Sequence, residues 1–148
     1  MADLLADPNP IVQIAAMDQL HAGLGDEVAE KLLAMTISDS PEVRDAAIGF
    51  LAAHTEALPN QMLLEAIRDQ DPWKRAAAAA ILAQTLPPEA LKQLSATLTD
   101  PSVYVRLTAA TALVREKTVG RGMVEGAIPN EHDQWLRNAI EDLLRQQP

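Results

Sequence analysis

Apolar residues recur along the chain at offsets of three, four and eight positions, the spacing that aligns side chains on one face of an α-helix. Val43, Ala46, Ala47 and Leu51 follow this spacing, and most of the equivalent positions in the stretches before and after them are apolar as well. The small alanines let a neighbouring helix approach closely. The pattern therefore predicts a series of helices that pack against one another through narrow apolar faces.

The chain also repeats itself with a period of 31 residues, which is typical of a solenoid built from stacked units. One position of the repeat is always leucine: Leu20, Leu51, Leu82, Leu113 and Leu144. Another position is Gln13 in the first unit and arginine afterwards: Arg44, Arg75, Arg106 and Arg137. Two such columns in one frame indicate a genuine repeat.

Each unit begins with signals for a helix start. A column of side chains can accept a hydrogen bond from an unpaired amide of the first turn: Asn9, Ser40, Asp71, Ser102 and Asp133. Proline follows the first three of them, at a position where its missing N–H costs nothing. Second helices are expected at residues 26–37, 59–67, 88–98 and 120–128. The sequence predicts a single domain, residues 1–148, of about four and a half units that is open at both ends.

The segments DSPEVRDAA (39–47) and DPSVYVR (100–106) resemble HEAT-like repeats of the short type first associated with phycobilisome bilin lyases. The resemblance covers nearly the whole chain. It implies an all-α, right-handed solenoid with first helices on the convex side and second helices lining the concave side. It also implies that the recurring Asp and Arg residues link adjacent repeats. Ankyrin and tetratricopeptide repeats have similar periods, but their signature residues are missing.

Composition narrows the function classes. Aromatic residues make up only 3% of the chain, which suits close-packed helices better than a sheet. The absence of cysteine excludes disulfides and thiolate metal sites. A net charge of −9 with dispersed basic residues disfavours nucleic-acid binding. The start of the chain lacks the pattern of a signal peptide and no run is long enough to span a membrane, so we expect a cytoplasmic protein.

The arginine column has two interpretations. It could form an anion-binding row, because the arginines recur at roughly the spacing of packed helices, about 10 Å. The favoured interpretation is structural: each arginine bonds acceptors in the loops between helices. The acceptors expected are a column of loop side chains, Asp39, Asp69, Asp100 and Asn130.

No pattern of catalytic or cofactor-binding residues is found. His21 and His54 have no adjacent glutamate, and Glu131 precedes His132 in the reverse of the order found in di-iron HEAT-like hydroxylases, so we predict no metal site and histidines in surface or loop positions. The glycines at 120, 122 and 126 lack the context of a phosphate loop and predict a weak second helix instead. We predict a protein that is not an enzyme and needs no cofactor.

Two surfaces are candidates for binding a partner. Trp73, Tyr104 and Trp135 share the second position of the first helix in successive units, and such aromatic residues are favoured in interfaces. Alternatively, they cover the gaps between repeats. The second surface is a mixed, largely polar strip on the second helices: Lys31, Met35, Gln61, Glu65, Lys92 and Ser95.

The favoured function is a scaffold or adaptor that binds another protein through its solenoid surface. The resemblance supplies the alternative, a bilin-lyase-like subunit that handles a chromophore. A DNA glycosylase of the HEAT-like kind is disfavoured by the acidic charge. A structural piece of a larger assembly is the fourth possibility, because an open C-terminal end would expose Ile140, Leu143 and Leu144 and allow self-association.

Overall fold

The computed structural model describes residues 3–20, 25–54, 60–85, 88–116 and 119–146, and these form helices joined by short loops. The first helices of the units are α1 (Pro10–Asp18), α3 (Pro41–Ala53), α5 (Pro72–Thr85), α7 (Val103–Arg115) and α9 (Gln134–Gln146). The second helices are α2 (Asp26–Met35), α4 (Asn60–Ala66), α6 (Pro88–Thr97) and α8 (Gly120–Ala127). Short 3₁₀ turns, η1 (Leu4–Ala6) and η3 (Ile128–Asn130), precede α1 and follow α8.

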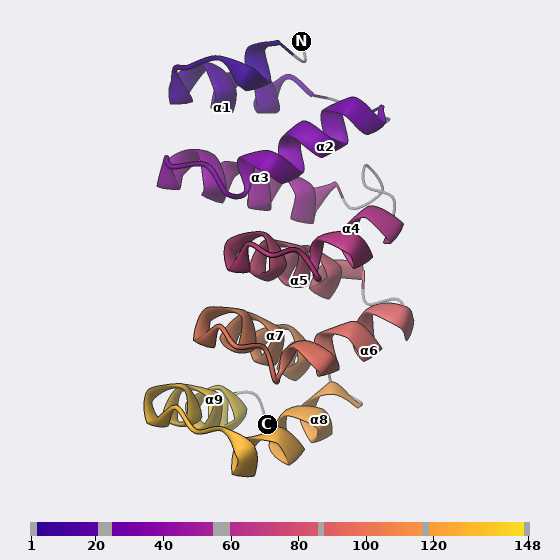
Figure 1. The fold of residues 1–148 in the computed structure, drawn as a ribbon, viewed down its shortest axis with the longest axis vertical. Helices are drawn as coiled ribbons and strands as arrows, with labels where there is room; N and C mark the ends of the chain where they lie inside the picture. Colours follow the sequence, from indigo (N-terminus) through magenta and orange to yellow (C-terminus); the bar gives the residue numbers. More distant parts are fainter. Residues whose placement is uncertain (1–2, 21–24, 55–59, 86–87, 117–118, 147–148) are drawn as a thin grey trace.

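The helices stack in two layers along the long axis of the molecule (Figure 1). Each first helix packs on the next one, α1 on α3, α3 on α5, α5 on α7 and α7 on α9. The second helices form the other layer, and α2, α4 and α6 each also contact the first helix that follows them. Within the described part of the chain there is no strand, so the predicted all-α solenoid is confirmed.

The predicted starts of the first helices are confirmed, because each of these helices begins at the residue that follows the expected cap position. Four cap side chains accept a hydrogen bond from a first-turn N–H at 2.7 to 3.4 Å: Asn9, Ser40, Asp71 and Asp133. Ser102 occupies the same place, but its side chain makes no cap bond. The second helices begin within one residue and end within two residues of the expected positions.

Helix α8 forms despite its glycines, and Gly120 has a packing reason to be glycine. A Cβ atom at this position would lie 2.2 Å from the carbonyl oxygen of Leu113 in α7. No side chain larger than hydrogen fits at such a distance, so the glycine lets the start of α8 approach α7. At Gly122 and Gly126 an added Cβ would meet no atom within 4 Å.

The core runs the length of the stack along the predicted columns. Leu51, Leu82 and Leu113 are fully buried, and Leu144 is 8% exposed. A column of alanines lies four residues after Val43 and its equivalents in the other repeats. Ala47, Ala78 and Ala109 of this column are fully buried as well. Because these alanines lie between successive first helices, the repeats pack through small side chains at close range.

The two ends of the stack differ in polarity. At the N-terminal end Leu4 and Ile11 are 46% and 75% exposed. The prediction that the C-terminal end exposes Ile140 and Leu144 is wrong, because both are buried and Leu143 is half-buried. Helix α9 has one apolar face, and that face already packs against the preceding repeat.

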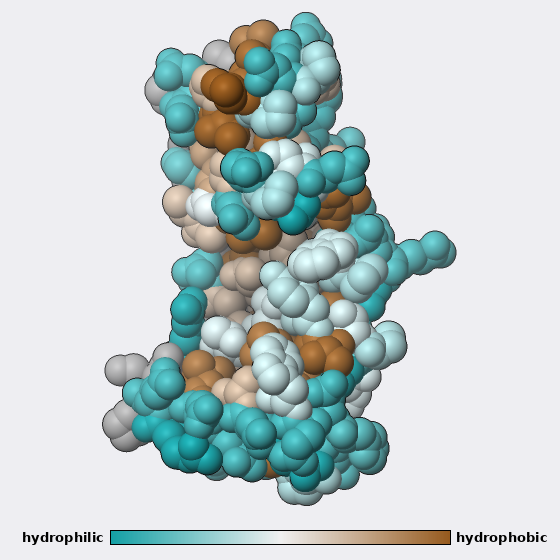
Figure 2. Space-filling model, turned by 90° about the vertical axis from the view of Figure 1, so that its left-hand side faces the viewer, coloured by the Kyte–Doolittle hydropathy of each residue, from teal (hydrophilic) through white to brown (hydrophobic). Residues whose placement is uncertain are grey.

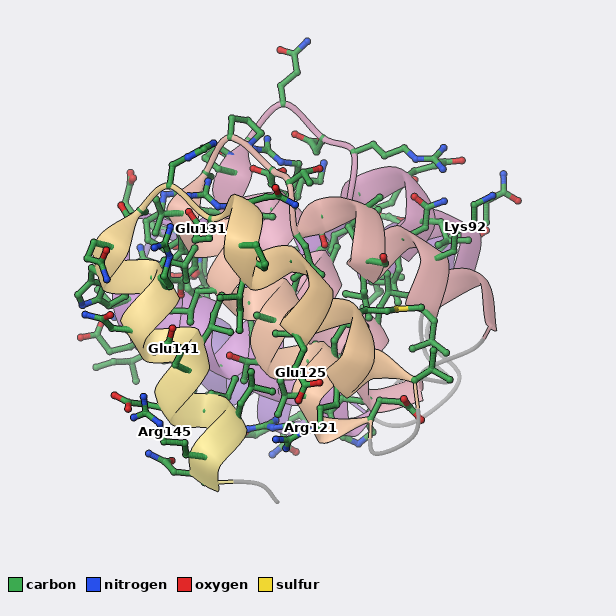
Figure 3. All side chains as sticks on the ribbon, turned by 90° about the horizontal axis from the view of Figure 1, so that it is seen from below. Lys92, Arg121, Glu125, Glu131, Glu141 and Arg145 are labelled. Atoms are coloured by element: carbon green, nitrogen blue, oxygen red, sulfur yellow. The ribbon has the colours of Figure 1, made fainter. Side chains whose placement is uncertain are left out.

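The outer side of the C-terminal end is polar. Figure 3 shows this end from below, with Glu141 and Arg145 on α9 beside Arg121 and Glu125 on α8. Arg121 and Arg145 each form an ion pair within their own helix, with Glu125 at 2.9 Å and with Glu141 at 3.4 Å. Among the described residues no helix meets the length and apolar character that crossing a bilayer requires.

Candidate binding surface

Two arginines bridge successive repeats in the same way. The Nη1 atom of Arg75 donates to the carbonyl oxygens of Asp69 and Gln70, both at 2.9 Å, within its own repeat. Its Nε and Nη2 atoms donate to the two carboxylate oxygens of Asp100 in the next repeat, both at 2.8 Å. Arg106 repeats this pattern with Glu131, at 2.8 and 3.0 Å. We call these two bridges the arginine ladder.

The ladder is shielded from solvent. Its side chains are between 7% and 15% exposed. Burial acts to raise the pKa of Asp100, but the bonds from Arg75 and from the Ser102 N–H outweigh it, and the pKa falls below its ordinary 3.8. The bond from Arg106 likewise lowers the pKa of Glu131 below its ordinary 4.5, against the effect of burial. Both carboxylates therefore stay ionised inside the stack.

The structural interpretation of the arginine column agrees with this geometry, with corrections at two of the expected acceptors. Asn130 is exposed, and Glu131 accepts from Arg106 instead. Asp39 accepts from Arg44 through its backbone carbonyl oxygen. Asp69, Asp100 and Glu131 share one position of the 31-residue period, and Asp39 and Asn130 each lie one residue away from it. Arg137 donates to the carbonyl oxygen of Glu131, which keeps it within its own repeat.

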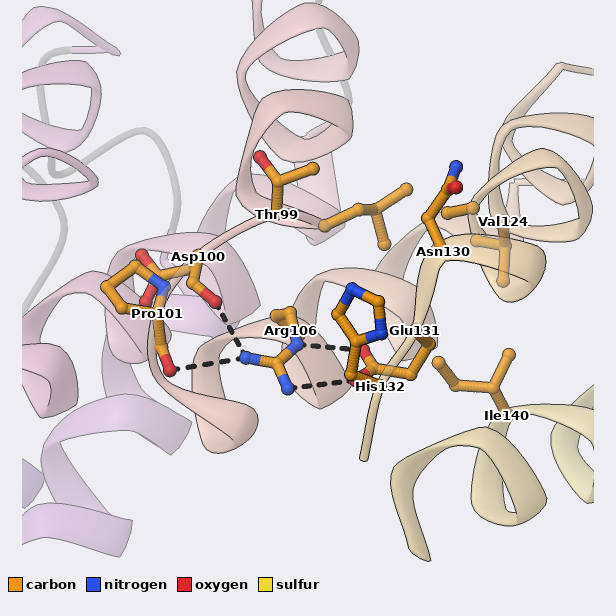
Figure 4. A pocket seen from close by; sticks show the side chains of 11 residues that line it. Thr99, Asp100, Pro101, Arg106, Val124, Asn130, Glu131, His132 and Ile140 are labelled. Atoms are coloured by element: carbon orange, nitrogen blue, oxygen red, sulfur yellow. Dashed lines mark hydrogen bonds and ion pairs between the residues drawn. The ribbon is translucent and has the colours of Figure 1, made fainter. Parts of the chain in front are cut away.

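A pocket of about 370 Å³ lies beside the second bridge of the ladder (Figure 4). Leu98, Val124 and Ile140 supply apolar walls. Arg106 also lines the pocket, but each of its three guanidinium nitrogens already donates: Nη1 to the carbonyl oxygens of Asp100 and Pro101, and Nε and Nη2 to Glu131. We call this the ladder pocket. It offers apolar surface, while the guanidinium nitrogens of Arg106 are already bonded within the protein.

The junction between α3 and α5 breaks the ladder. The carboxylate that corresponds to Asp100 and Glu131 is Asp69, and Lys74 of its own repeat binds it at 2.7 Å. Lys74 is the exception in a column that is otherwise apolar. Arg44 keeps only the bonds of its Nη1 atom to the carbonyl oxygens of Ser38 and Asp39, at 2.6 and 3.3 Å. Its guanidinium lies over the ring of Trp73, 5.8 Å from the centroid.

The aromatic side chains are exposed, as the interface interpretation requires. Trp73, Tyr104 and Trp135 are 49%, 50% and 62% exposed. The rings of Trp73 and Tyr104 are 4.5 Å apart between centroids and tilted by 53°, so this pair also spans the gap between α5 and α7. Trp73 and Tyr104 therefore close a gap between repeats, and each also leaves about half of its surface open to solvent, so a role in an interface stays a prediction.

A groove follows α5 on the same side of the molecule. It consists of a hollow of about 510 Å³ towards α3 and one of about 240 Å³ towards α7. The two hollows share Ala80, Tyr104 and Thr108, so they are continuous. Its floor is a run of small side chains on α5: Ala76, Ala77, Ala80 and Ala83. In Figure 2 light brown and near-white surface gathers in the middle of this face, above a hydrophilic lower end. We call this feature the α5 groove.

Sequence reasoning missed the α5 groove, although two signals for it were present. The alanine run 76–80 in α5 leaves the surface of this helix without large side chains. Lys74 lies in a column that is otherwise apolar, and it binds the carboxylate of Asp69, which corresponds to the acceptors of the ladder arginines. Neither signal indicated by itself that the alanine run and Arg44 line the same groove.

The predicted strip on the second helices is only partly a surface. Met35 is 7% exposed and belongs to the core, so its assignment to a binding surface is wrong. The exposed Gln61 donates to Glu65 at 3.2 Å, and Lys31 pairs with Glu27 at 3.0 Å. Lys92 is exposed and Ser95 is half-buried. These residues do not line the α5 groove.

The two histidines among the described residues have separate surroundings. His132 is exposed beside the ladder pocket, and His54 is half-buried against Phe50, with 4.3 Å between ring centroids. His21 lies outside the described residues. In the part of the chain that the structure describes, no three His, Cys, Asp or Glu side chains are grouped as metal ligands are.

Comparisons with known proteins agree with the repeat architecture. Residues 60–145 match the family described as HEAT repeats. A relative from Synechococcus sp. (strain WH8020), named Bilin biosynthesis protein MpeU, is 31% identical over 109 residues. The match covers 70% of this chain, whereas it covers only 37% of the length of that relative.

Proposed function

The chain belongs to the HEAT-repeat family, and on that premise we propose that it is a scaffold or adaptor that binds another protein in the α5 groove. The observation that carries the proposal is the exposed pair of Trp73 and Tyr104 at the edge of an alanine-floored groove. Large aromatic side chains contribute strongly to protein interfaces when they border a pocket that a partner can fill. Solenoids also present extended surfaces of this kind.

The test is affinity capture from the cells that produce the protein. The wild-type chain is compared with the double variant Trp73→Ala, Tyr104→Ala and with a control variant on the other layer, Gln61→Ala, Lys92→Ala. We expect the aromatic variant to lose the proteins that the wild-type chain captures, and the control to keep them. Far-UV circular dichroism checks that both variants fold. Equal capture by the aromatic variant and the wild-type chain would contradict the proposal.

A second candidate function is the handling of a bilin chromophore, and the name of the Synechococcus relative favours it. The ladder pocket has the apolar walls that a flat conjugated ligand would need, and its volume of about 370 Å³ falls within the range of ligand pockets. Mixing the chain with a bilin should then shift the absorbance spectrum of the bilin. Ala127→Phe, which fills the pocket, should abolish the shift. An unchanged spectrum with the wild-type chain would exclude this candidate.

A further inference from the structure

Arg44 has the donor geometry of the ladder arginines but lacks their acceptor. Arg75 and Arg106 use Nη1 for their own loop and direct Nε and Nη2 together at a carboxylate. Arg44 uses Nη1 in the same way. Within the described residues, however, no carboxylate contacts its Nε and Nη2 atoms, because Lys74 holds the corresponding Asp69.

The contact with Trp73 does not consume these donors. A guanidinium stacks through its flat face, whereas its N–H groups point outward in the plane of the group. Arg44 can therefore remain over the ring of Trp73 and still accept a carboxylate at its edge. Its side chain lines the same hollow as Trp73, Ala76 and Ile48, so a carboxylate that reaches it comes from whatever occupies the α5 groove.

The charges around the groove define what fits. Glu42 and Asp45 flank Arg44 on α3, and Asp45 lines the groove itself. The hydroxyl of Ser40 donates to Glu42 at 2.7 Å, so Glu42 is held next to the cap. Two nearby negative charges oppose a doubly charged phosphate more strongly than a singly charged carboxylate. A single carboxylate on an otherwise neutral or basic segment suits these charges best.

We propose that the α5 groove binds a segment of a partner protein that presents one Asp or Glu carboxylate to Arg44 and an apolar side chain to the alanine floor beside Trp73. This inference rests on the proposed function, since it names the class of partner that the groove takes. The carboxylate occupies the place that Asp100 and Glu131 occupy on the ladder arginines. The partner thereby completes the interrupted ladder at Arg44, between the second and third repeats.

The test selects binders from a displayed library of random short peptides, with the purified chain as the target. The library is selected in parallel on the wild-type chain, on Arg44→Gln, on Trp73→Ala and on Asp45→Asn. We expect peptides selected on the wild-type chain to be enriched in an acidic residue near an apolar one, and this enrichment to disappear with Arg44→Gln. Asp45→Asn should retain it, because that change removes a repelling charge and keeps Arg44.

The best peptide then gives a quantitative check. Replacing its acidic residue with the matching amide should weaken binding about tenfold, as should Arg44→Gln, and the two changes together should cost no more than either alone. Tighter binding of a phosphoserine version would overturn the carboxylate assignment. So would acidic enrichment that persists on Arg44→Gln.

The outcomes separate this inference from the function on which it rests. Peptides that need Trp73 but show no acidic preference would leave the α5 groove as the binding surface and overturn the role of Arg44. Selection of peptides that depend on neither Trp73 nor Arg44 would overturn both. Circular dichroism of the Arg44→Gln variant checks that it keeps the helical content of the wild-type chain.

Discussion

The α5–α7 junction and the α3–α5 junction are built from the same columns of the repeat but are held differently. At α5–α7 a buried guanidinium and carboxylate join the repeats through two parallel bonds. At α3–α5 the carboxylate is taken by a lysine of its own repeat, and the arginine lies on an exposed tryptophan. The two junctions differ at the residue beside the carboxylate: the position of Lys74 is Val105 in the next repeat.

The comparison suggests how a repeat protein gains a binding site without a change of fold. A local cation competes for the loop carboxylate, and the arginine of the preceding repeat loses its partner. That arginine then lies at the edge of a groove instead of inside a bridge. Structural repeats and binding repeats can thus share one frame and differ at a single side chain.

Replacing the arginine of each junction with alanine should give the largest difference in unfolding free energy between the two junctions. Arg75→Ala leaves the buried carboxylate of Asp100 without its cation and should lower the free energy of unfolding by about 3 kcal/mol. Arg44→Ala removes two bonds to loop carbonyls and one cation–π contact and should cost about 1 kcal/mol. Urea unfolding followed by far-UV circular dichroism measures both. Equal losses would mean that the ladder does not distinguish the junctions.

Acid should also lower the free energy of unfolding through the ladder junctions, by less than Arg75→Ala does. Since the pKa values of Asp100 and Glu131 are lowered in the folded chain, the two carboxylates stabilise it above their ordinary values of 3.8 and 4.5. This stability is lost as the pH falls through the lowered pKa values. Unfolding free energies measured from about pH 6 downward should therefore decrease below about pH 4.5. The protonated acids still form hydrogen bonds, so the loss is smaller than that caused by Arg75→Ala.

A matched variant tests the assignment of this acid effect. Arg75→Ala removes the cation that lowers the pKa of Asp100 and leaves the burial that raises it. Its unfolding free energy should fall less steeply with acid than that of the wild-type chain. Arg44→Ala should keep the wild-type slope. The same slope in all three proteins would show that other carboxylates govern the acid response.

The helices could be predicted from the sequence because their signals are local. Each cap lies next to the helix that it starts, and the apolar stripe of each first helix spans only nine positions, as from Val43 to Leu51. The caps at Ser40 and Asp71 bond the amides that the pattern indicates. The 31-residue period then assigns neighbours, because equivalent helices of adjacent repeats stack.

The candidate binding surface could not be predicted in the same way, because its geometry depends on which of several distant side chains bond to one another. Asp69 can bind Arg44 or Lys74, and only the three-dimensional arrangement shows that it binds Lys74. Met35 ends a run of four apolar residues in α2, so the sequence alone does not show which of them face the core. Ile140 and Leu144 were expected to be exposed because the C-terminal end of the stack is open, but their face packs against the preceding repeat.

Replacing Lys74 with valine, as at the equivalent position of the next repeat, should convert the α3–α5 junction into a ladder junction. We expect this change to have the smallest effect on stability. Lys74→Val frees Asp69, which Arg44 can then bind as Arg75 binds Asp100. The lost pair with Lys74 is partly exposed and worth little, so the exchange should raise the free energy of unfolding by less than about 1 kcal/mol. The double variant Asp69→Asn, Lys74→Val lacks the carboxylate and should show no gain. Urea unfolding compares the two.

The effect of Lys74→Val on peptide binding should be larger than its effect on stability. In Lys74→Val the edge of Arg44 is occupied by Asp69, so peptides that depend on a carboxylate should bind about tenfold more weakly than they bind the wild-type chain. The double variant should restore their binding, because Arg44 again lacks an acceptor. If Lys74→Val binds these peptides as tightly as the wild-type chain does, Lys74 is not the residue that separates the two junctions. A gain in stability together with a loss of binding would show that one arginine serves either the stack or the partner.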